Sequence, residues 1–230
     1  MATYNGERYI EEQLNSILPQ LEARDEVIIS DDSSTDRTVA IIESYKDFRI
    51  VIYKNQKFKS PIFNFENAIK KSTGDIIVLS DQDDVWKKNK IKVILKNFKN
   101  KKSLLLVMDN YVVDCNLNIL HNSLYEYLNS GSGVIKNLYK NTYLGCNMAF
   151  TSNLKKYILP FPRYISMHDI WIGLTLNLFT EVIFSKEKTL LFRRHQNNAT
   201  KMNENFFRVV FFRLYMACAI IANYFKKLGK

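Results

Sequence analysis

Short apolar runs alternate with segments of helical periodicity through the first half of the chain, and this alternation limits the fold more than any other feature. Four continuous apolar runs fit strands that are buried on both faces: 27–30, 50–53, 76–80 and 104–108. Four other segments carry apolar residues at helical spacing: 11–21, 39–45, 63–71 and 91–98. Strands that alternate with helices indicate an α/β fold with a doubly wound, mostly parallel sheet.

The second half of the chain is less regular. The runs 111–113 and 118–120 predict a hairpin, which would be a small antiparallel addition to the sheet. Further strands and helices are predicted, in this order, for 154–159 (helix), 170–179 (helix), 182–184 (strand) and 189–192 (strand). The polar segment 122–140 contains Ser130-Gly131-Ser132-Gly133, which predicts a flexible loop.

The start of the chain departs from this pattern. Residues 2–6 have the character of a ligand-binding loop, but almost no apolar residues precede them. A doubly wound sheet normally opens with a buried strand that leads into its first ligand loop. We therefore expect the first strand of the sheet to be largely missing.

Length and composition limit the class of protein. The chain has 230 residues, of which 47% are apolar, so a large core is expected and a disordered chain is excluded. The three cysteines, Cys115, Cys146 and Cys218, are odd in number and form no CxxC pair. This pattern favours a reducing compartment over a disulfide framework. The N-terminus has no apolar signal region, and we expect a cytoplasmic protein.

A cluster of carboxylates follows the strand predicted at 76–80. Asp81, Asp83 and Asp84 lie within four positions. Such carboxylates repel one another, so a cation, a proton or water must balance them. Oxygen ligands at the end of a strand suit Mg²⁺ or Mn²⁺, which also bind phosphate oxygens. The alternative is a solvated acidic turn that caps the following helix.

Four other polar residues follow predicted strands or precede a predicted helix. Asp31 and Asp32 end the strand at 27–30 and are suited to binding a nucleobase or ribose, although helix capping explains them as well. Asp169 precedes a helix and is suited to act as a general base, with capping again as the alternative. His195 is suited to bind Mn²⁺, but a lone histidine is more often structural.

The chain is strongly basic, with a net charge of +10. This charge would fit a nucleic-acid binder, but the lysines between residues 87 and 102 are scattered along a predicted helix and its exit, as on a solvated face. We therefore expect no nucleic-acid partner. A basic surface also attracts anionic lipid.

Residues 205–227 combine many aromatic side chains with basic ones such as Arg208 and Arg213. This composition is typical of a helix that lies on a membrane surface, and it lacks the ~20 uncharged apolar residues of a spanning helix. A helix buried against the domain and a dimer contact fit equally well, so oligomerisation stays open. We divide the chain into a main domain, 1–200, and an amphipathic helical tail, 201–230.

Six motifs, in order and spacing, resemble the family 2 glycosyltransferases of the GT-A fold, a Rossmann-like α/β fold. They are Ala2-Thr3-Tyr4-Asn5-Gly6-Glu7, Ile29-Ser30-Asp31-Asp32-Ser33-Ser34-Thr35-Asp36, Thr73-Gly74-Asp75, Leu79-Ser80-Asp81-Gln82-Asp83-Asp84-Val85-Trp86, Met167-His168-Asp169 and Arg194-His195-Gln196-Asn197-Asn198. The form of the fourth motif, the segment 112–114 and the fifth motif together resemble bacterial rhamnosyltransferases of cell-wall and capsule polysaccharide synthesis.

This resemblance implies a role for each matched residue. Thr3, Tyr4, Asp31, Asp32 and Asp81 match positions at the nucleotide. Asp81 and Asp83 match the DxD pair, with Asp83 as the direct ligand of Mn²⁺ or Mg²⁺, and His195 matches a histidine that approaches the metal or the diphosphate. Asp169 matches the catalytic base.

The resemblance implies a metal-dependent, inverting hexosyltransferase. Its partners would be a nucleotide-diphosphate sugar, with rhamnose as one candidate, and a growing bacterial surface glycan that is lipid-linked. It would work in the cytoplasm, with a peripheral contact to the inner face of the cell membrane through 205–227. The alternative is a catalytically inactive nucleotide-sugar-binding or scaffold protein of the same fold, which the short first strand would favour.

Overall fold

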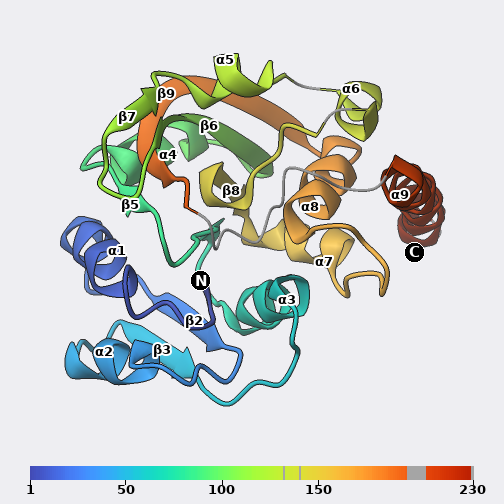
Figure 1. Cartoon of the computed structure of the whole chain (residues 1–230). Helices are drawn as coiled ribbons and strands as arrows, with labels where there is room; N and C mark the ends of the chain where they lie inside the picture. The colour runs from blue at the N-terminus through green and yellow to red at the C-terminus, as the bar shows by residue number, and fades with distance from the viewer. Residues whose placement is uncertain (132, 140, 196–205, 229–230) are drawn as a thin grey trace.

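Two β-sheets form two halves of the molecule, and the N-terminus lies between them (Figure 1). The computed structural model describes residues 1–131, 133–139, 141–195 and 206–228. The first sheet is parallel, with its strands in the order β1 (Ala2–Thr3), β2 (Val27–Asp31) and β3 (Ile50–Tyr53).

The second sheet has six strands in the order β4-β8-β6-β9-β5, and β7 pairs with the far part of β6. Their bounds are β4 (Ile76–Val78), β5 (Val85–Trp86), β6 (Leu104–Val113), β7 (Ile119–His121), β8 (Met148–Thr151) and β9 (Glu181–Arg193). β6 and β9 are parallel, whereas β4 and β6 are antiparallel to β8, and β5 is antiparallel to β9.

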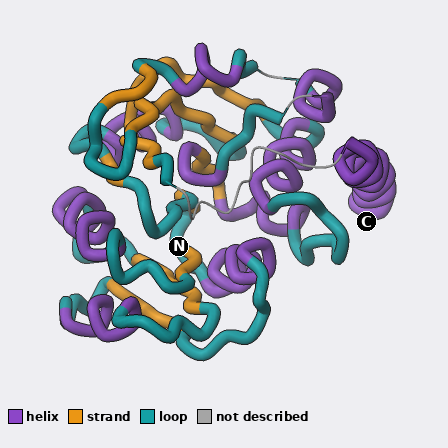
Figure 2. Tube along the Cα trace, in the orientation of Figure 1, coloured by secondary structure: helices purple, strands orange, loops and turns teal. Residues whose placement is uncertain are grey.

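Helices surround both sheets (Figure 2). The α-helices are α1 (Ile10–Ile17), α2 (Thr38–Ser44), α3 (Pro61–Lys71), α4 (Lys90–Phe98), α5 (Leu124–Leu128), α6 (Val134–Tyr139), α7 (Lys155–Ile158), α8 (His168–Asn177) and α9 (Phe206–Leu228). Short 3₁₀ turns are η1 (Leu18–Gln20), η2 (Gly145–Asn147) and η3 (Ser152–Leu154).

The predicted α/β fold is confirmed, and its antiparallel part is larger than the sequence indicated. The two strands predicted at 182–184 and 189–192 are one long strand, β9, because the polar residues between them form a bulge rather than a turn. The register of β9 against β6 shifts from Met108↔Ser185 to Asp109↔Lys188 at that point. The polar segment 122–140 also contains the short helices α5 and α6.

The packing of the hydrophobic core determines where the loops that carry the candidate site residues lie. Fully buried apolar residues of β6 and β8, such as Leu105 and Phe150, pack with Trp171 of α8 and Phe65 of α3. This packing holds the amino end of α8 close to the loops that follow β2 and β4, because α3 contacts both β2 and α8. The ends of these elements therefore meet at one place.

Helix α9 packs on the outside of α8 (Figure 1). Met216 and Ile220 are buried in the main core, and the Asn223 side chain donates a hydrogen bond to the Tyr157 carbonyl at 2.8 Å. The opposite face of α9 carries exposed Phe211, Leu214, Ile221 and Phe225. Within the described parts of the chain, no helix is both long and apolar enough to span a membrane.

Candidate active site

A cavity of about 680 Å³ lies where the carboxyl ends of β2 and β4 meet the amino end of α8. Six of the residues that the sequence singled out line it: Thr3, Tyr4, Asp32, Asp81, Asp83 and Asp169. His195 contacts Asp83, and the buried Asp31 accepts a hydrogen bond from Thr3 of the cavity lining. The structure therefore brings residues from five separate segments of the chain to one site.

The two carboxylates at the end of β2 make different hydrogen bonds and stabilise different loops. Asp31 is buried and is bonded to Thr3 Oγ1 at 2.8 Å and to the Ser34 backbone N–H at 2.9 Å, so its oxygens hold the two loops together. Asp32 lines the cavity and accepts hydrogen bonds from the backbone N–H groups of Phe58 and Ser60, at 2.7 and 3.0 Å. It thereby fixes the loop between β3 and α3, whose Lys57 and Lys59 line the cavity.

A side-chain amide joins the first loop to the acidic loop. Gln82 Oε1 accepts from the Tyr4 N–H at 2.9 Å, and Gln82 Nε2 donates to the Tyr4 carbonyl at 3.0 Å. This pairing requires Gly6, because a Cβ atom added there would lie 2.4 Å from Gln82 Oε1. The exposed Tyr4 ring is thus held at the rim of the cavity, where an aromatic face can stack on a planar ligand.

Asp81 carries a raised pKa. Burial, followed by the charges of Asp83 and Asp169, raises the pKa of Asp81 to about 7. The charges of Asp83 and Asp169 thus disfavour ionisation of Asp81 in this cavity, and a bound cation would relieve that repulsion. Gln13 of α1 fixes this loop, because its Nε2 donates to the Asp81 carbonyl at 2.7 Å.

His195 contacts the same cluster. Its Nε2 lies 2.9 Å from Asp83 Oδ2, and its ring stacks on Tyr9 with ring centroids 4.9 Å apart. Two carboxylates and an imidazole suit Mn²⁺, and the carboxylates alone suit Mg²⁺. The residues present therefore fit the divalent ion that the resemblance implies.

Asp81 also belongs to a second group of possible metal ligands, whose other members are buried. Asp81, Asp84 and the Cys146 thiol each place one donor atom within 4.8 Å of the others. Burial raises the pKa of both Asp84 and Cys146 well above the usual range, so a protonated thiol and a protonated carboxyl are favoured there. Hard cations prefer ionised oxygen ligands, so this group fits the ion less well than Asp81 with Asp83.

A buried lysine, which the sequence analysis did not single out, underlies the acidic loop. Lys90 is fully buried; its Nζ donates to the Cys146 carbonyl at 2.7 Å and lies 4.6 Å from the centre of the Trp86 ring. Burial lowers its pKa to about 8, and Cys146, Asp84 and Asp81 would each oppose that change when ionised. The ammonium group therefore offsets part of the negative charge of the loop from below.

Arg193, at the end of β9, also holds this loop. Its Nε donates to the Asp83 carbonyl at 2.8 Å, and its backbone N–H donates to Asp84 Oδ1 at 2.9 Å. The guanidinium also forms an ion pair with Glu12. The next residue, Arg194, lines the cavity itself.

Asp169 lies in the first turn of α8. Its Oδ1 accepts from the Ile170 N–H at 2.7 Å and its Oδ2 from the Gly145 N–H at 3.3 Å, so two backbone donors orient the carboxylate. Burial raises its pKa to about 6, above the ordinary 3.8, and these hydrogen bonds oppose the rise. A carboxylate with this pKa is ionised at neutral pH and is still basic enough to accept a proton.

The neighbouring His168 also lines the cavity. It is 4% exposed and stacks on Phe65 with centroids 3.9 Å apart, and burial lowers its pKa to about 3. Neither ring nitrogen has a hydrogen-bond partner among the described residues. The neutral imidazole therefore supplies an aromatic wall with unused polar atoms beside Asp169.

Sequence reasoning identified Arg194 but missed two other cations of the cavity. Lys57 and Lys59 come from a loop with no motif, so only the fold could bring them beside Asp81 and Asp83. Gln196, Asn197 and Asn198 of the sixth motif lie outside the described residues. The cavity thus combines carboxylates, cations and apolar walls, which suits a ligand with a diphosphate, a planar base and hydroxyl groups.

Comparison with known proteins gives a family for this arrangement. The sequence profile of the family described as "Glycosyl transferase family 2" matches residues 1–159, which include the first four motifs. The chain is 31% identical over 237 residues to the dTDP-rhamnosyl transferase RfbG of Shigella flexneri, a match that covers 90% of this chain and 75% of that protein.

A second curated relative comes from Escherichia coli. It is the UDP-Glc:alpha-D-GlcNAc-diphosphoundecaprenol beta-1,3-glucosyltransferase WfgD, 26% identical over 177 residues, or 76% of this chain and 67% of that protein.

Among solved structures, residues 1–349 of Staphylococcus aureus TarS in complex with UDP-GlcNAc share the fold. The TM-score is 0.70 at 20% sequence identity, over 94% of this chain. The chain spans 64% of the length of that TarS fragment.

Proposed function

The chain belongs to glycosyl transferase family 2, and from this premise we propose that it moves a sugar from a nucleotide diphosphate to a hydroxyl group of a growing bacterial surface glycan, with inversion at the anomeric carbon. One observation carries the proposal: the Asp81 and Asp83 carboxylates, the Asp169 carboxylate and the cations Lys57, Lys59 and Arg194 all belong to a single cavity of about 680 Å³. It has room and charge for a nucleotide-diphosphate sugar.

In the proposed mechanism, Asp169 acts as the general base. The acceptor oxygen attacks the anomeric carbon while the bond from that carbon to the diphosphate oxygen breaks, and the hydroxyl proton moves to Asp169. The backbone N–H groups of Gly145 and Ile170 hold the carboxylate in place for this transfer. A single displacement of this kind inverts the configuration.

The other residues bind the donor. Lys57, Lys59 and Arg194 are suited to pair with the diphosphate oxygens, and the Tyr4 ring is suited to stack on the nucleobase beside Asp32. Asp81, Asp83 and His195 would hold Mn²⁺ or Mg²⁺, which when bound offsets the negative charge of the diphosphate leaving group. Asp31 and Thr3 would support the nucleotide site from below through their mutual hydrogen bond.

The proposed sugar is rhamnose, a hexose, and the proposed acceptor is lipid-linked. Support for the sugar comes from the similarity to RfbG, which is described as a dTDP-rhamnosyl transferase. Support for the acceptor comes from WfgD, whose name gives a diphosphoundecaprenol acceptor. The names of both relatives describe transferases that use nucleotide-activated sugar donors.

The proposed location is the inner face of the cell membrane. Exposed Phe211, Leu214 and Phe225 on α9 form an apolar face, and Arg213 and Lys226 lie on the same helix. Apolar and basic side chains on one helix suit insertion into the headgroup region of an anionic membrane. The free thiols of Cys115, Cys146 and Cys218 are compatible with a reducing cytoplasm.

Isothermal calorimetry tests the donor site. dTDP and UDP should bind in the presence of Mn²⁺, and the Asp83→Ala substitution should weaken this binding at least about tenfold, since charged ligand contacts contribute roughly 1.5–3 kcal/mol. The matched control is Asp75→Ala, because Asp75 is exposed and does not line the cavity. Unchanged binding in Asp83→Ala would contradict the assignment.

A thermal-shift screen then tests the sugar. dTDP-rhamnose with Mn²⁺ should raise the melting temperature more than UDP-glucose, UDP-N-acetylglucosamine or GDP-mannose does. If another donor raised the melting temperature more, the sugar of that donor would replace rhamnose in the proposal. Donor binding without turnover, with every acceptor offered, would instead support an inactive nucleotide-sugar-binding protein.

A further inference from the structure

The His168 ring precedes the proposed base in the chain and contacts two other elements of the fold. Its face stacks on the Phe65 ring of α3, with the centroids 3.9 Å apart and an angle of 17° between the ring planes. Its Nε2 edge points at Gly145 of η2, because a Cβ atom added to Gly145 would lie 2.7 Å from Nε2 but 3.6 Å from Cδ2 and Cε1. The imidazole therefore fills the space between α3 and η2, and it leaves no room for a side chain at Gly145.

The Gly145 backbone in turn binds the proposed base. Its N–H donates to Asp169 Oδ2 at 3.3 Å, at the long end of the range for such bonds. The other backbone donor, the Ile170 N–H, follows Asp169 directly in the chain and lies 2.7 Å from Oδ1. The Gly145 bond joins residues that are 24 positions apart, so it depends on how η2 is packed. The His168 ring is part of that packing.

The imidazole contributes its shape and not a charge or a hydrogen bond. Both ring nitrogens are buried, and neither has a hydrogen-bond partner among the described residues. Burial also lowers the pKa of His168 to about 3, so the ring is neutral at physiological pH. A neutral ring places no cation beside Asp169, where a positive charge would lower the pKa of the carboxyl group and weaken it as a base.

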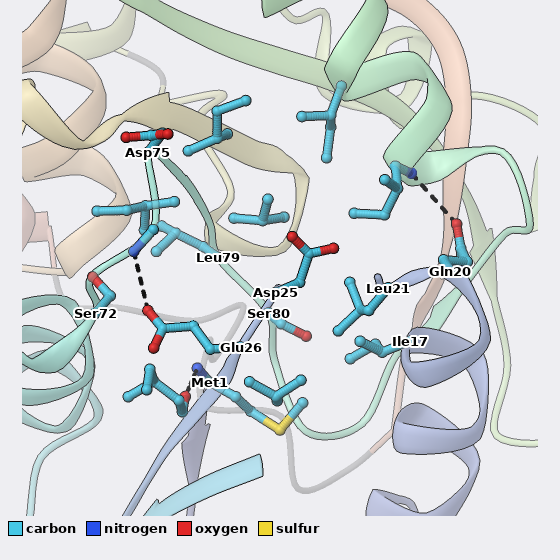
Figure 3. Close-up of a pocket in the computed structure, with 18 of the residues that line it drawn as sticks. Met1, Ile17, Gln20, Leu21, Asp25, Glu26, Ser72, Asp75, Leu79 and Ser80 are labelled. Carbon is cyan, nitrogen blue, oxygen red and sulfur yellow. Dashed lines mark hydrogen bonds between the residues drawn. The ribbon is translucent and has the colours of Figure 1, made fainter. Parts of the chain in front are cut away.

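Phe65 completes the contact from the side of α3. It belongs to the main core, and it lines both the donor cavity and a second cavity of about 430 Å³ between β2 and β4 (Figure 3). Since free space borders its ring, Phe65 has room to move when the imidazole is absent. Removal of the His168 side chain would thus loosen both of its partners, Phe65 and Gly145.

We propose that His168 is a positioning residue, whose ring holds the Gly145 backbone in place and so keeps the Gly145 N–H on the Asp169 carboxylate. It acts through Gly145 and not on the substrate, because its nitrogens are buried. This inference rests on the proposed function, since it assigns a part in the same proton transfer. It goes beyond that function by placing the control of the base in a contact between α3, η2 and α8.

The His168→Ala substitution in the full chain tests the role in the reaction. The rate of dTDP release from dTDP-rhamnose is measured with Mn²⁺ and with water in place of the acceptor. The kcat should fall about 10–100-fold, because the base loses its orientation, whereas the Kd for dTDP should change less than about threefold. The matched control is Thr175→Ala, which removes buried atoms from the same helix away from the cavity and should keep kcat within about twofold.

Free imidazole provides a rescue experiment. The ring of the free compound fits the gap that His168→Ala leaves, so it should restore kcat of this variant at least about fivefold. The unaltered chain at the same imidazole concentration measures any effect on Mn²⁺. An unchanged kcat in His168→Ala, or a loss of kcat that is matched by an equal loss of dTDP affinity, would overturn the proposal.

A double-mutant cycle tests the contact itself. In Gly145→Ala, the new methyl group displaces the ring, so kcat should fall by a factor similar to that of His168→Ala. In the double variant, the methyl group enters the space that the ring has left, so the loss should be no greater than that of the worse single variant. Losses that multiply would show that the two residues act independently and would overturn the proposal.

Hydrogen exchange tests the packing without any substrate. The Gly145 amide should exchange at least about tenfold faster in His168→Ala than in the unaltered chain, whereas the amides of Leu105 and Phe150 in the core strands should keep their rates. Equal exchange at Gly145 would contradict the packing role. Faster exchange at Gly145 in a chain that releases no dTDP would support the contact and count against the proposed function. Turnover that is unaffected by His168→Ala would do the reverse.

Discussion

At the scale of single residues, Asp169 has the surroundings of a base that is positioned before the substrate arrives. It is 6% exposed, and two backbone N–H groups bind its oxygens. The next ring in the chain, His168, has no hydrogen-bond partner for its nitrogens among the described residues. The Asp169 side chain thus has little freedom to lose when an acceptor binds. Preorganisation of this kind lowers the cost of reaching the transition state.

The Asp169→Asn substitution should therefore lower kcat by about 10²–10⁴-fold, the usual contribution of a general base. The amide keeps the size of the carboxylate but accepts no proton, so the affinity for dTDP with Mn²⁺ should change less than about threefold. Steady-state kinetics and calorimetry on the same preparation separate the two effects. A variant that keeps more than half of the kcat would exclude Asp169 as the base.

The raised pKa of Asp169 predicts an acid limit for activity. Since burial raises that pKa to about 6, the carboxylate becomes protonated below pH 6, and kcat should fall about tenfold for each further pH unit. Stability should respond in the opposite direction: the contribution of this group is fully present below pH 3.8 and is lost as the pH rises through 6. A kcat profile that stays flat from pH 7 to pH 5 would contradict the assignment.

Gly6 tests the link between the first loop and the acidic loop. In Gly6→Ala, the new Cβ displaces Gln82 and breaks its two hydrogen bonds to Tyr4, which should cost about 1–3 kcal/mol of unfolding free energy. Nucleotide affinity should fall as well, because Tyr4 loses its position. The control is Gly74→Ala, whose Cβ would meet only the Ile76 carbonyl at 3.8 Å. Urea unfolding and calorimetry on both variants measure the difference, and equal stability would contradict the link.

At the scale of secondary-structure elements, the sequence predicted the parts that local pattern controls. The apolar runs that became β2, β3, β4 and the first half of β6 were identified, as were the acidic residues at the ends of β2 and β4. A buried strand in an α/β sheet has a continuous apolar sequence, and its ligand residues follow it directly, so both signals are local.

The elements that the sequence missed depend on long-range contacts. β5, with only Val85 and Trp86, exists because β9 lies beside it, and the bulge in β9 exists because β6 continues beyond it. The fold also brings three lysines to the site from segments without a motif: Lys57, Lys59 and Lys90. The burial that lowers the pKa of Lys90 to about 8 arises only in the folded chain.

Helix α9 makes a prediction of its own. Replacing Phe211, Leu214 and Phe225 by Ser should reduce co-sedimentation with vesicles that contain anionic lipid by at least about fivefold, because each exposed side chain contributes apolar area to insertion. The melting temperature should stay within about 2 °C, since these side chains are exposed. The control is Phe48→Ser, which removes a 77% exposed ring from the loop between α2 and β3. Equal sedimentation of the triple variant and the unaltered chain would exclude this face as the membrane contact.

At the scale of the whole molecule, the donor cavity spans both sheets. Thr3 and Asp32 come from the first sheet, whereas Asp81, Cys146 and Phe192 belong to the second or to the loops beside it. A nucleotide diphosphate in this cavity would contact both halves at once. Its binding is therefore coupled to the association of the two sheets.

Ligand binding should consequently stabilise the fold as a unit. At a dTDP concentration of about 100 Kd, with Mn²⁺, the unfolding free energy should rise by about 2.7 kcal/mol, and the melting temperature by about 5–11 °C. Chelation of the metal should remove most of this gain if Asp81 and Asp83 hold the ion. Scanning calorimetry with and without EDTA measures both effects. If EDTA left the rise in melting temperature unchanged, donor binding would not depend on the metal.

A cavity of about 430 Å³ lies between β2 and β4 (Figure 3), and its free space has a consequence for the evolution of this chain. Because this cavity leaves unfilled space, its lining tolerates larger side chains, and filling the space should stabilise this layer of the molecule. Ala68 and Ile94, on opposite faces, are therefore positions where a larger side chain is expected to increase robustness at little cost to the distant acceptor side. Directed evolution for thermal tolerance should find its first gains in this layer.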